Sequence, residues 1–374
     1  MFDFSTRLNR KNSDSIKWSR YRNTDVLPFW VADMDFATPK FILDAIRHRL
    51  EHPILGYSDI PPDLTQAFIQ WAQRHFNWSI QEEWVLWLPS VVGGLNVAVR
   101  AVGKEDDHCV IPIPIYPPFL TIPELNQRIP ILSNLILENN RWVMDLNDIE
   151  KKTEQASTLL ISNPQNPTGR AYSKTELQEL GNLCVRNNTV IVSDEIHWGI
   201  ILNPATPHTP IATISEAISQ QTITLISHTK TYNIPGEPCA VAVISNPEIR
   251  ECFRTWGTRM LPICSPLAIA GATASFCDTS SYLVELNQYL RDNRDLLVTA
   301  VNDSDTLHVT KPEATYLAWI DVNNLSLADP ITHFERHGLG LSDGSEFGVP
   351  GFVRFNFAVP KTLLTEGIKR LLSA

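Results

Sequence analysis

Three polar side chains that can perform chemistry follow three strand-like segments of this sequence. Asn166, Asp194 and Lys230 each come shortly after a run rich in Ile, Leu, Val and Thr, at residues 158–162, 189–192 and 223–226. Such runs are typical of buried parallel strands, and open α/β sheets bind ligands beyond the carboxyl ends of those strands. A lysine amine there can form a Schiff base with a carbonyl compound. A lone lysine is more often a solvated loop charge, so the interpretation rests on all three residues together.

The order and context of these residues resemble a known enzyme family. The segments are 163–169 (NPQNPTG), 193–197 (SDEIH) and 227–233 (SHTKTYN). They are similar to the motifs of fold-type I enzymes that use pyridoxal phosphate (PLP), in the class I/II aminotransferase superfamily. The resemblance runs from about Asp25 to the C-terminus. It implies an α/β fold: a large domain whose mainly parallel sheet lies between helices, plus a smaller α+β domain.

The resemblance assigns roles to the residues that would hold and activate the cofactor. Lys230 would form the Schiff base with PLP and later act as the base that removes the substrate proton. Asp194 would keep the pyridine nitrogen protonated, although an aspartate in this place can also cap a helix. Asn166 would contact the ring hydroxyl and the substrate carboxylate. Tyr116 would stack on the ring or pack in the core, and His197 is either a cofactor contact or a packed histidine.

The cofactor phosphate needs donors at a helix N-terminus, where backbone amides point outward. Three candidates precede or open an expected helix at 93–102, namely Ser90, Val91 and Val92. Ser227 and Thr229 carry hydroxyl groups beside the lysine, and Tyr57 would come from the neighbouring subunit. A contribution from Tyr57, which we also expect to act in catalysis, implies a homodimer, with the segment 258–265 as a second candidate for the interface.

One position departs from the aminotransferase pattern. Most aminotransferases have an arginine for the phosphate eight residues after the lysine, whereas this chain has Pro238, preceded by Glu237. Proline cannot replace the planar fork of donors that a guanidinium supplies. The carbon–sulfur lyase branch of the superfamily also often lacks this arginine. The departure therefore favours that branch and predicts weaker retention of PLP.

Other segments bear on the substrate and on the branch of the family. Arg354, in the run 351–356 (GFVRFN), resembles the arginine that grips the substrate α-carboxylate through a bidentate pair. Ala32, a further candidate for substrate binding, lies in the run 27–36 (LPFWVADMDF). That run, SDEIH and TYLAWID at 315–321 resemble the MalY/PatB group of cystathionine β-lyases.

This resemblance implies PLP-dependent β-elimination of S-substituted cysteines, which gives a thiol, pyruvate and ammonia. Two alternatives stay open. One is an aminotransferase on the same scaffold, because fold and cofactor motifs do not separate the two reactions. The other is a regulatory role in which the protein binds another protein.

Composition narrows the classes of partner. The chain has 374 residues and a net charge of −10, which disfavours nucleic acid as a partner. No apolar run reaches the length of a membrane span, and the first residues do not resemble a signal peptide. The six cysteines form no Cys-x-x-Cys pair, and His197 and His208 lack partners at ligand spacing, so we expect no metal site. A cytoplasmic protein with reduced thiols is the expectation.

Alternating strand and helix patterns predict three parts of the chain. Residues 1–45 would form an N-terminal arm and part of the small domain, residues 46–279 the large PLP-binding domain, and residues 280–374 the C-terminal small domain. Ser173 and Glu176 have the spacing of a capping box, which predicts a helix over 173–187.

Overall fold

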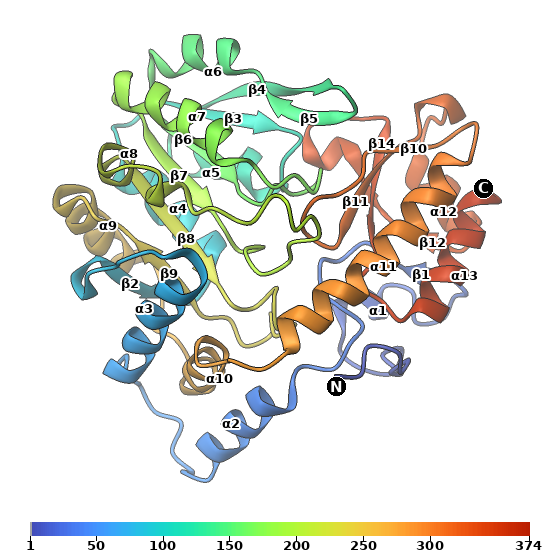
Figure 1. Ribbon diagram of the computed structural model, residues 1–374, viewed down its shortest axis with the longest axis horizontal. Helices are drawn as coiled ribbons and strands as arrows, with labels where there is room; N and C mark the ends of the chain where they lie inside the picture. Colours follow the sequence, from blue (N-terminus) through green and yellow to red (C-terminus); the bar gives the residue numbers. More distant parts are fainter. Residues whose placement is uncertain (1) are drawn as a thin grey trace.

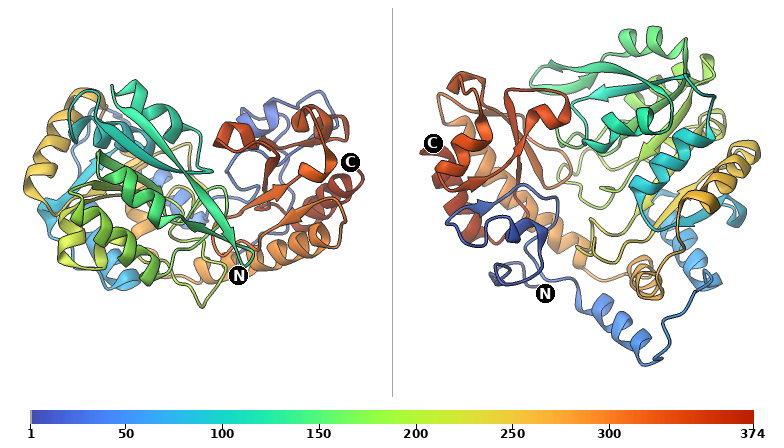
Figure 2. Two further views of the ribbon diagram at one scale, coloured as in Figure 1. Left: turned by 90° about the horizontal axis from the view of Figure 1, so that it is seen from above. Right: turned by 180° about the vertical axis from the view of Figure 1, so that it is seen from behind.

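The computed structural model describes residues 2–374 as two lobes of unequal size (Figures 1 and 2). The larger lobe is built on an eight-stranded sheet of order β2-β9-β8-β7-β6-β3-β4-β5. In that order the strands are Val85–Leu88, Ala240–Val243, Thr222–Ser227, Val190–Asp194, Ala156–Ser162, His108–Ile113, Ile129–Glu138 and Arg141–Met144. The five strands from β8 to β4 are mutually parallel. Antiparallel strands extend both edges, so the expected mainly parallel sheet is confirmed.

Helices cover both faces of this sheet, which explains why its strands read as continuous apolar runs. On one face lie α4 (Val91–Ala101), α5 (Pro118–Leu125) and α9 (Pro247–Met260), which Figure 2 shows from behind. On the other lie α6 (Leu146–Thr153), α7 (Lys174–Arg186) and α8 (Glu216–Gln220). Side chains of consecutive residues in β7 point to opposite faces of the sheet. Val192 packs in the core beneath α4, α5 and α9, and Ile191 in the core beneath α6, α7 and α8.

The smaller lobe has a four-stranded antiparallel sheet of order β10-β11-β14-β13. Its strands are His308–Val309, Leu317–Asp321, Phe352–Asn356 and Ser342–Asp343, and its helices are α11 (Tyr282–Asn302), α12 (Pro330–Arg336) and α13 (Lys361–Leu372). Near the N-terminus, α1 (Ile16–Ser19) leads to β1 (Leu27–Pro28), which pairs in parallel with β12 (Leu339–Gly340). The N-terminal segment therefore joins the small lobe, as the blue and red ribbons show in Figure 1.

Three further helices pack together: α2 (Lys40–Leu50), α3 (Pro62–Phe76) and α10 (Pro266–Phe276), with α10 in contact with both others. Four short 3₁₀ helices complete the described chain: η1 (Glu82–Trp84), η2 (Ile211–Thr213), η3 (Asn323–Leu325) and η4 (Gly344–Phe347). The domain limits at 45/46 and 279/280 stay a prediction.

Two helix starts differ from the sequence-based expectation, and both matter for the site. The helix expected at 93–102 begins at Val91, because the Ser90 hydroxyl accepts a hydrogen bond from the Gly93 amide at 3.0 Å and caps it. The alternating pattern of the sequence also predicts a helix over 116–126, and this helix begins at Pro118, because proline suits the first helical position, where no amide hydrogen is needed. The capping box of Ser173 is confirmed.

Candidate active site

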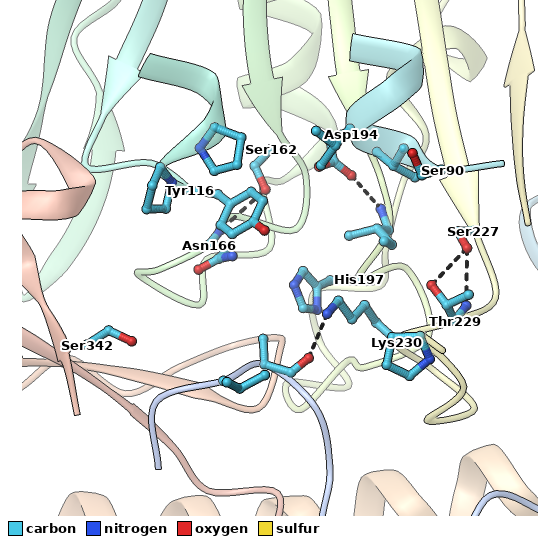
Figure 3. Close-up of a pocket in the computed structure, with 18 of the residues that line it drawn as sticks. Ser90, Tyr116, Ser162, Asn166, Asp194, His197, Ser227, Thr229, Lys230 and Ser342 are labelled. Atoms are coloured by element: carbon cyan, nitrogen blue, oxygen red, sulfur yellow. Dashed lines mark hydrogen bonds between the residues drawn. The ribbon is translucent and has the colours of Figure 1, made fainter. Parts of the chain in front are cut away.

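A cavity of about 510 Å³ lies beyond the carboxyl ends of β6, β7 and β8, with walls from both lobes (Figure 3). The parallel register brings these strand ends level, since Ser162 pairs with Asp194 and Asp194 with Leu225. The cavity gathers nearly all the residues that the sequence singled out. They are Ala32, Ser90, Val91, Val92, Tyr116, Asn166, Asp194, His197, Ser227, Thr229, Lys230 and Arg354.

Lys230 follows β8 and extends into the cavity beside His197 (Figure 3). Its ammonium donates a hydrogen bond of 2.7 Å to the Ala32 carbonyl, which also accepts one of 3.0 Å from the Tyr316 hydroxyl. Burial lowers the pKa of Lys230 to about 8. A substantial fraction of this amine is therefore neutral near physiological pH, which is the form that acts as nucleophile or base.

Asp194 is the last residue of β7, and its carboxylate is almost completely buried. One oxygen accepts a hydrogen bond of 3.0 Å from the Ile196 amide. Burial raises the pKa of Asp194 to about 7 because a charge is costly away from water. A cation placed against this group would reverse that effect, and the site is therefore suited to a protonated ring nitrogen.

The next residue, Glu195, has a structural role. Its buried carboxylate accepts hydrogen bonds from the Ser193 hydroxyl at 2.9 Å and from the Ile211 amide at 3.2 Å. It also pairs with the His208 imidazole at 2.9 Å. These contacts tie β7 to the loop that follows it, away from the cavity lining.

Arg354 extends from β14 in the small lobe and is buried. Its guanidinium donates hydrogen bonds to Asn166 Oδ1 at 3.1 Å and to the Trp30 carbonyl at 2.7 Å. It lies over the Phe347 ring at 4.7 Å. Within residues 2–374 it has no carboxylate partner, and its Nε has no hydrogen-bond acceptor. A buried cation without an anion beside it is suited to bind a carboxylate, and this role of Arg354 stays a prediction.

The expected phosphate region lies at the N-terminus of α4. The first amides of this helix have no partner inside it, so Val91 and Val92 can donate to an anion. On the same side of the cavity in Figure 3, the Ser227 hydroxyl donates to the Cys239 carbonyl at 2.7 Å and accepts from the Thr229 amide at 3.2 Å. Pro238, at the sequence position where most aminotransferases have an arginine, also lines the cavity.

His197 adds no charge to the cavity. Burial lowers its pKa to about 3, so the ring is neutral at physiological pH. Its Nδ1 has no partner among the described residues, and the ring packs against Tyr316 at 5.7 Å. Tyr116 lies beside Asn166 in Figure 3, on the wall opposite Lys230. The stacking role of Tyr116 stays a prediction.

Tyr57 is the one candidate that lies outside this cavity. Its side chain is 99% exposed, in the loop between α2 and α3. It borders a separate hollow of about 330 Å³ with Ile263, Cys264 and Ser265. The segment 258–265 and Tyr57 are thus on one surface, and a role for Tyr57 in the site of another subunit stays a prediction.

Several lining residues carried no signal in the sequence. Trp30 lies in a segment of which only Ala32 was singled out, while Ser342, Glu346 and Phe347 belong to no motif. The last three come from β13 and η4, and only the packing of the small lobe on the large one brings them to the cavity. Their detection from sequence would require knowledge of that contact.

No group of His, Cys, Asp and Glu side chains within residues 2–374 has the arrangement of a metal site. Across the same residues, no helix is long and apolar enough to cross a membrane.

The family model for aminotransferase class I and II matches residues 24–371. The chain belongs to this family. It is 31% identical to cystathionine beta-lyase PatB of Bacillus subtilis, over 100% of this chain and 99% of the relative. The crystal structure of OvoB is similar with a TM-score of 0.96 at 40% identity, over 99% and 98% of the two chains. The PLP-bound C–S lyase from Staphylococcus hominis superposes with a TM-score of 0.92 at 28% identity, over 100% and 98%.

Proposed function

We propose that this protein is a PLP-dependent carbon–sulfur lyase. It eliminates the thiol from S-substituted cysteines and releases pyruvate and ammonia. The observation that carries the proposal is the convergence of Lys230, Asp194 and Arg354 on one cavity, in a family member that matches a cystathionine β-lyase along its whole length.

The residues present fit this cofactor. Asp194 is a buried carboxylate that lacks a cation, and a protonated pyridine nitrogen would supply one. Lys230 is an amine with a lowered pKa. The start of α4 offers backbone amides for the phosphate. When bound, PLP supplies an electron sink that makes the Cα–H bond of an amino acid acidic.

The chain's own residues then perform the elimination. Arg354 and Asn166 hold the α-carboxylate, which fixes the orientation of Cα in the cavity. The neutral Lys230 amine takes the Cα proton. The electron pair left behind expels sulfur from Cβ as a thiolate, and the remaining three-carbon fragment takes up water to give pyruvate and ammonia. The Ala32 carbonyl holds the Lys230 amine while it is free, at the 2.7 Å contact described above.

An aminotransferase is the second candidate, because the family includes such enzymes and both reactions begin with the same proton removal. Incubation with L-cystathionine separates the two. A lyase releases pyruvate in many turnovers without any added oxo acid. Amino-group transfer to an added oxo acid, with no pyruvate from cystathionine, would identify an aminotransferase and reject the proposal.

The proposal includes a homodimer and a cytoplasmic location. Support for the homodimer comes from exposed apolar side chains around Tyr57, including Ile263 at 55% and Leu55 at 55% exposure, since a patch of this kind is typical of an interface. Mixing a Tyr57→Phe protein with a Lys230→Ala protein tests shared sites. Hybrid dimers would contain one site with both native residues, so activity should exceed the sum of the two variants. Strict additivity would place Tyr57 outside the partner's site.

A further inference from the structure

Glu346 is an ionisable group in the cavity that the proposed reaction leaves without a role. Apart from Tyr116, the ionisable lining residues within the described chain are Asp194, His197, Lys230, Glu346 and Arg354. The proposed function uses the two basic groups and Asp194, and His197 is neutral. One carboxylate therefore remains for the part of the substrate that differs between thioethers.

The position of Glu346 places it at the mouth of the cavity. It is an exposed residue of η4, next to the buried Phe347. The Phe347 carbonyl accepts a hydrogen bond of 3.1 Å from the Ile115 amide, which fixes η4 against the residues that precede α5. Pro117 and Pro118, in that neighbouring segment, also line the cavity. Glu346 thus stands where the two lobes meet.

The carboxylate of Glu346 is free to meet a ligand. It has no salt bridge and no hydrogen-bond donor within residues 2–374, although many other carboxylates of the chain are paired. Its charge acts on the cavity. Burial is the larger effect and lowers the pKa of Arg354, whereas the negative charge of Glu346 raises it. Glu346 and Arg354 do not form an ion pair, so Arg354 stays available for the α-carboxylate.

The substrate's orientation follows from these two groups. With its α-carboxylate on Arg354 and its Cα near Lys230, an S-substituted cysteine must direct its sulfur substituent away from both, toward the mouth. There the substituent meets the apolar side chains of Trp30, Pro117 and Phe347 and one negative charge. A positive charge on the substituent would be attracted, and a negative one repelled.

We propose that Glu346 selects cysteine conjugates whose leaving thiol carries a cationic nitrogen group, such as an amine, over those with a neutral or anionic group. The inference rests on the proposed function, because it assumes that a cysteine thioether occupies the cavity. It assigns Glu346 to specificity, not to proton transfer.

Three conjugates of similar size test this selection: S-aminoethyl-, S-hydroxyethyl- and S-carboxymethyl-L-cysteine. We expect kcat/KM to fall in that order, with roughly tenfold between the first and last, as for a partly exposed charge. In Glu346→Gln the ratio should shrink to about twofold. Added salt should reduce the preference of the native protein but not that of the variant. Glu124→Gln, an exposed carboxylate of α5 outside the cavity lining, is the matched control and should keep the native ratio.

Binding gives a second readout that does not depend on turnover. Calorimetry with Lys230→Ala supplied with PLP should rank the dissociation constants of the three conjugates in the order expected for kcat/KM, and the addition of Glu346→Gln should remove most of that ranking. If no conjugate yields pyruvate but the ranking of binding holds, the lyase proposal fails and the selection by Glu346 stands. If pyruvate forms but Glu346→Gln leaves the ranking unchanged, or if no conjugate binds, the inference is wrong.

Discussion

At the scale of single residues, the site combines groups whose burial is unfavourable without a ligand. Asp194 is a carboxylate held away from water, and Arg354 is a guanidinium without a carboxylate. Each is stabilised by the charge that the proposed ligands would bring, a pyridinium and a substrate carboxylate. Without ligands, these two groups should therefore destabilise the folded protein. Removal of one of these charges should raise the free energy of unfolding of the cofactor-free protein.

Replacement of Asp194 by asparagine tests this directly. The folded state raises the pKa of this carboxyl from 3.8 to about 7, so it holds the proton more tightly than the unfolded state does. Stability of the cofactor-free protein should consequently fall as pH rises from about 4 to 7, by up to about 4 kcal/mol at 1.36 kcal/mol per unit. Asp194→Asn should lack this loss in urea unfolding at pH 5 and pH 8. If the free energies of unfolding of the two proteins changed equally with pH, the burial of a charged Asp194 carboxylate would be contradicted.

The same variant should be impaired when PLP is present. Without the carboxylate the ring nitrogen no longer favours its proton, and turnover should fall roughly a thousandfold, or about 4 kcal/mol in the barrier. Steady-state kinetics at saturating PLP checks this. Turnover close to that of the native protein would remove Asp194 from the mechanism.

Arg354→Lys tests the carboxylate site. A lysine retains the charge but not the planar fork, so the bidentate pair is lost. We expect kcat/KM to fall roughly ten- to hundredfold, the equivalent of about 1.5–3 kcal/mol for a charge-assisted hydrogen bond. PLP content, measured after denaturation, should be unchanged. A loss of PLP with unchanged KM would mean that Arg354 serves the cofactor instead.

At the scale of elements, buried strands were easy to predict and the small lobe's contribution was not. The strand-like run at 223–226 lies within β8, because a strand covered on both faces is apolar along most of its length. The edge strand β5 and the helix α6 were not foreseen, since β5 pairs on one side only and α6 is short. Asn166, Asp194 and Lys230 were found through their strands, whereas Glu346 and Ser342 reach the cavity only through tertiary packing.

The start of α4 carries the prediction that belongs to this scale. With Pro238 in place of an arginine, the phosphate would depend on neutral donors from α4 and from the segment after β8. Such donors bind an anion less strongly than a guanidinium does. PLP should therefore be lost faster on dialysis than from an arginine-bearing relative, and Pro238→Arg should slow the loss. Equal retention at matched pH and salt would show that another group replaces the arginine.

At the scale of the whole molecule, the site exists because two lobes meet. The large lobe presents Lys230 and Asp194 at its strand ends, and the small lobe supplies Arg354. The N-terminal segment lies between them, and its Trp30 and Ala32 carbonyls accept hydrogen bonds from Arg354 and Lys230. This segment is held by the small lobe through β1 and β12, so the geometry of the cavity depends on the relative position of the two lobes.

The proposed function depends most on one feature, the Schiff base that Lys230 would form with PLP in this cavity. Reduction of the PLP-loaded protein with borohydride, followed by proteolysis and mass spectrometry, measures it directly. We expect a single pyridoxyl adduct on the peptide that contains Lys230, and no adduct in Lys230→Ala. An adduct on another lysine, or one that persists in Lys230→Ala, would contradict it.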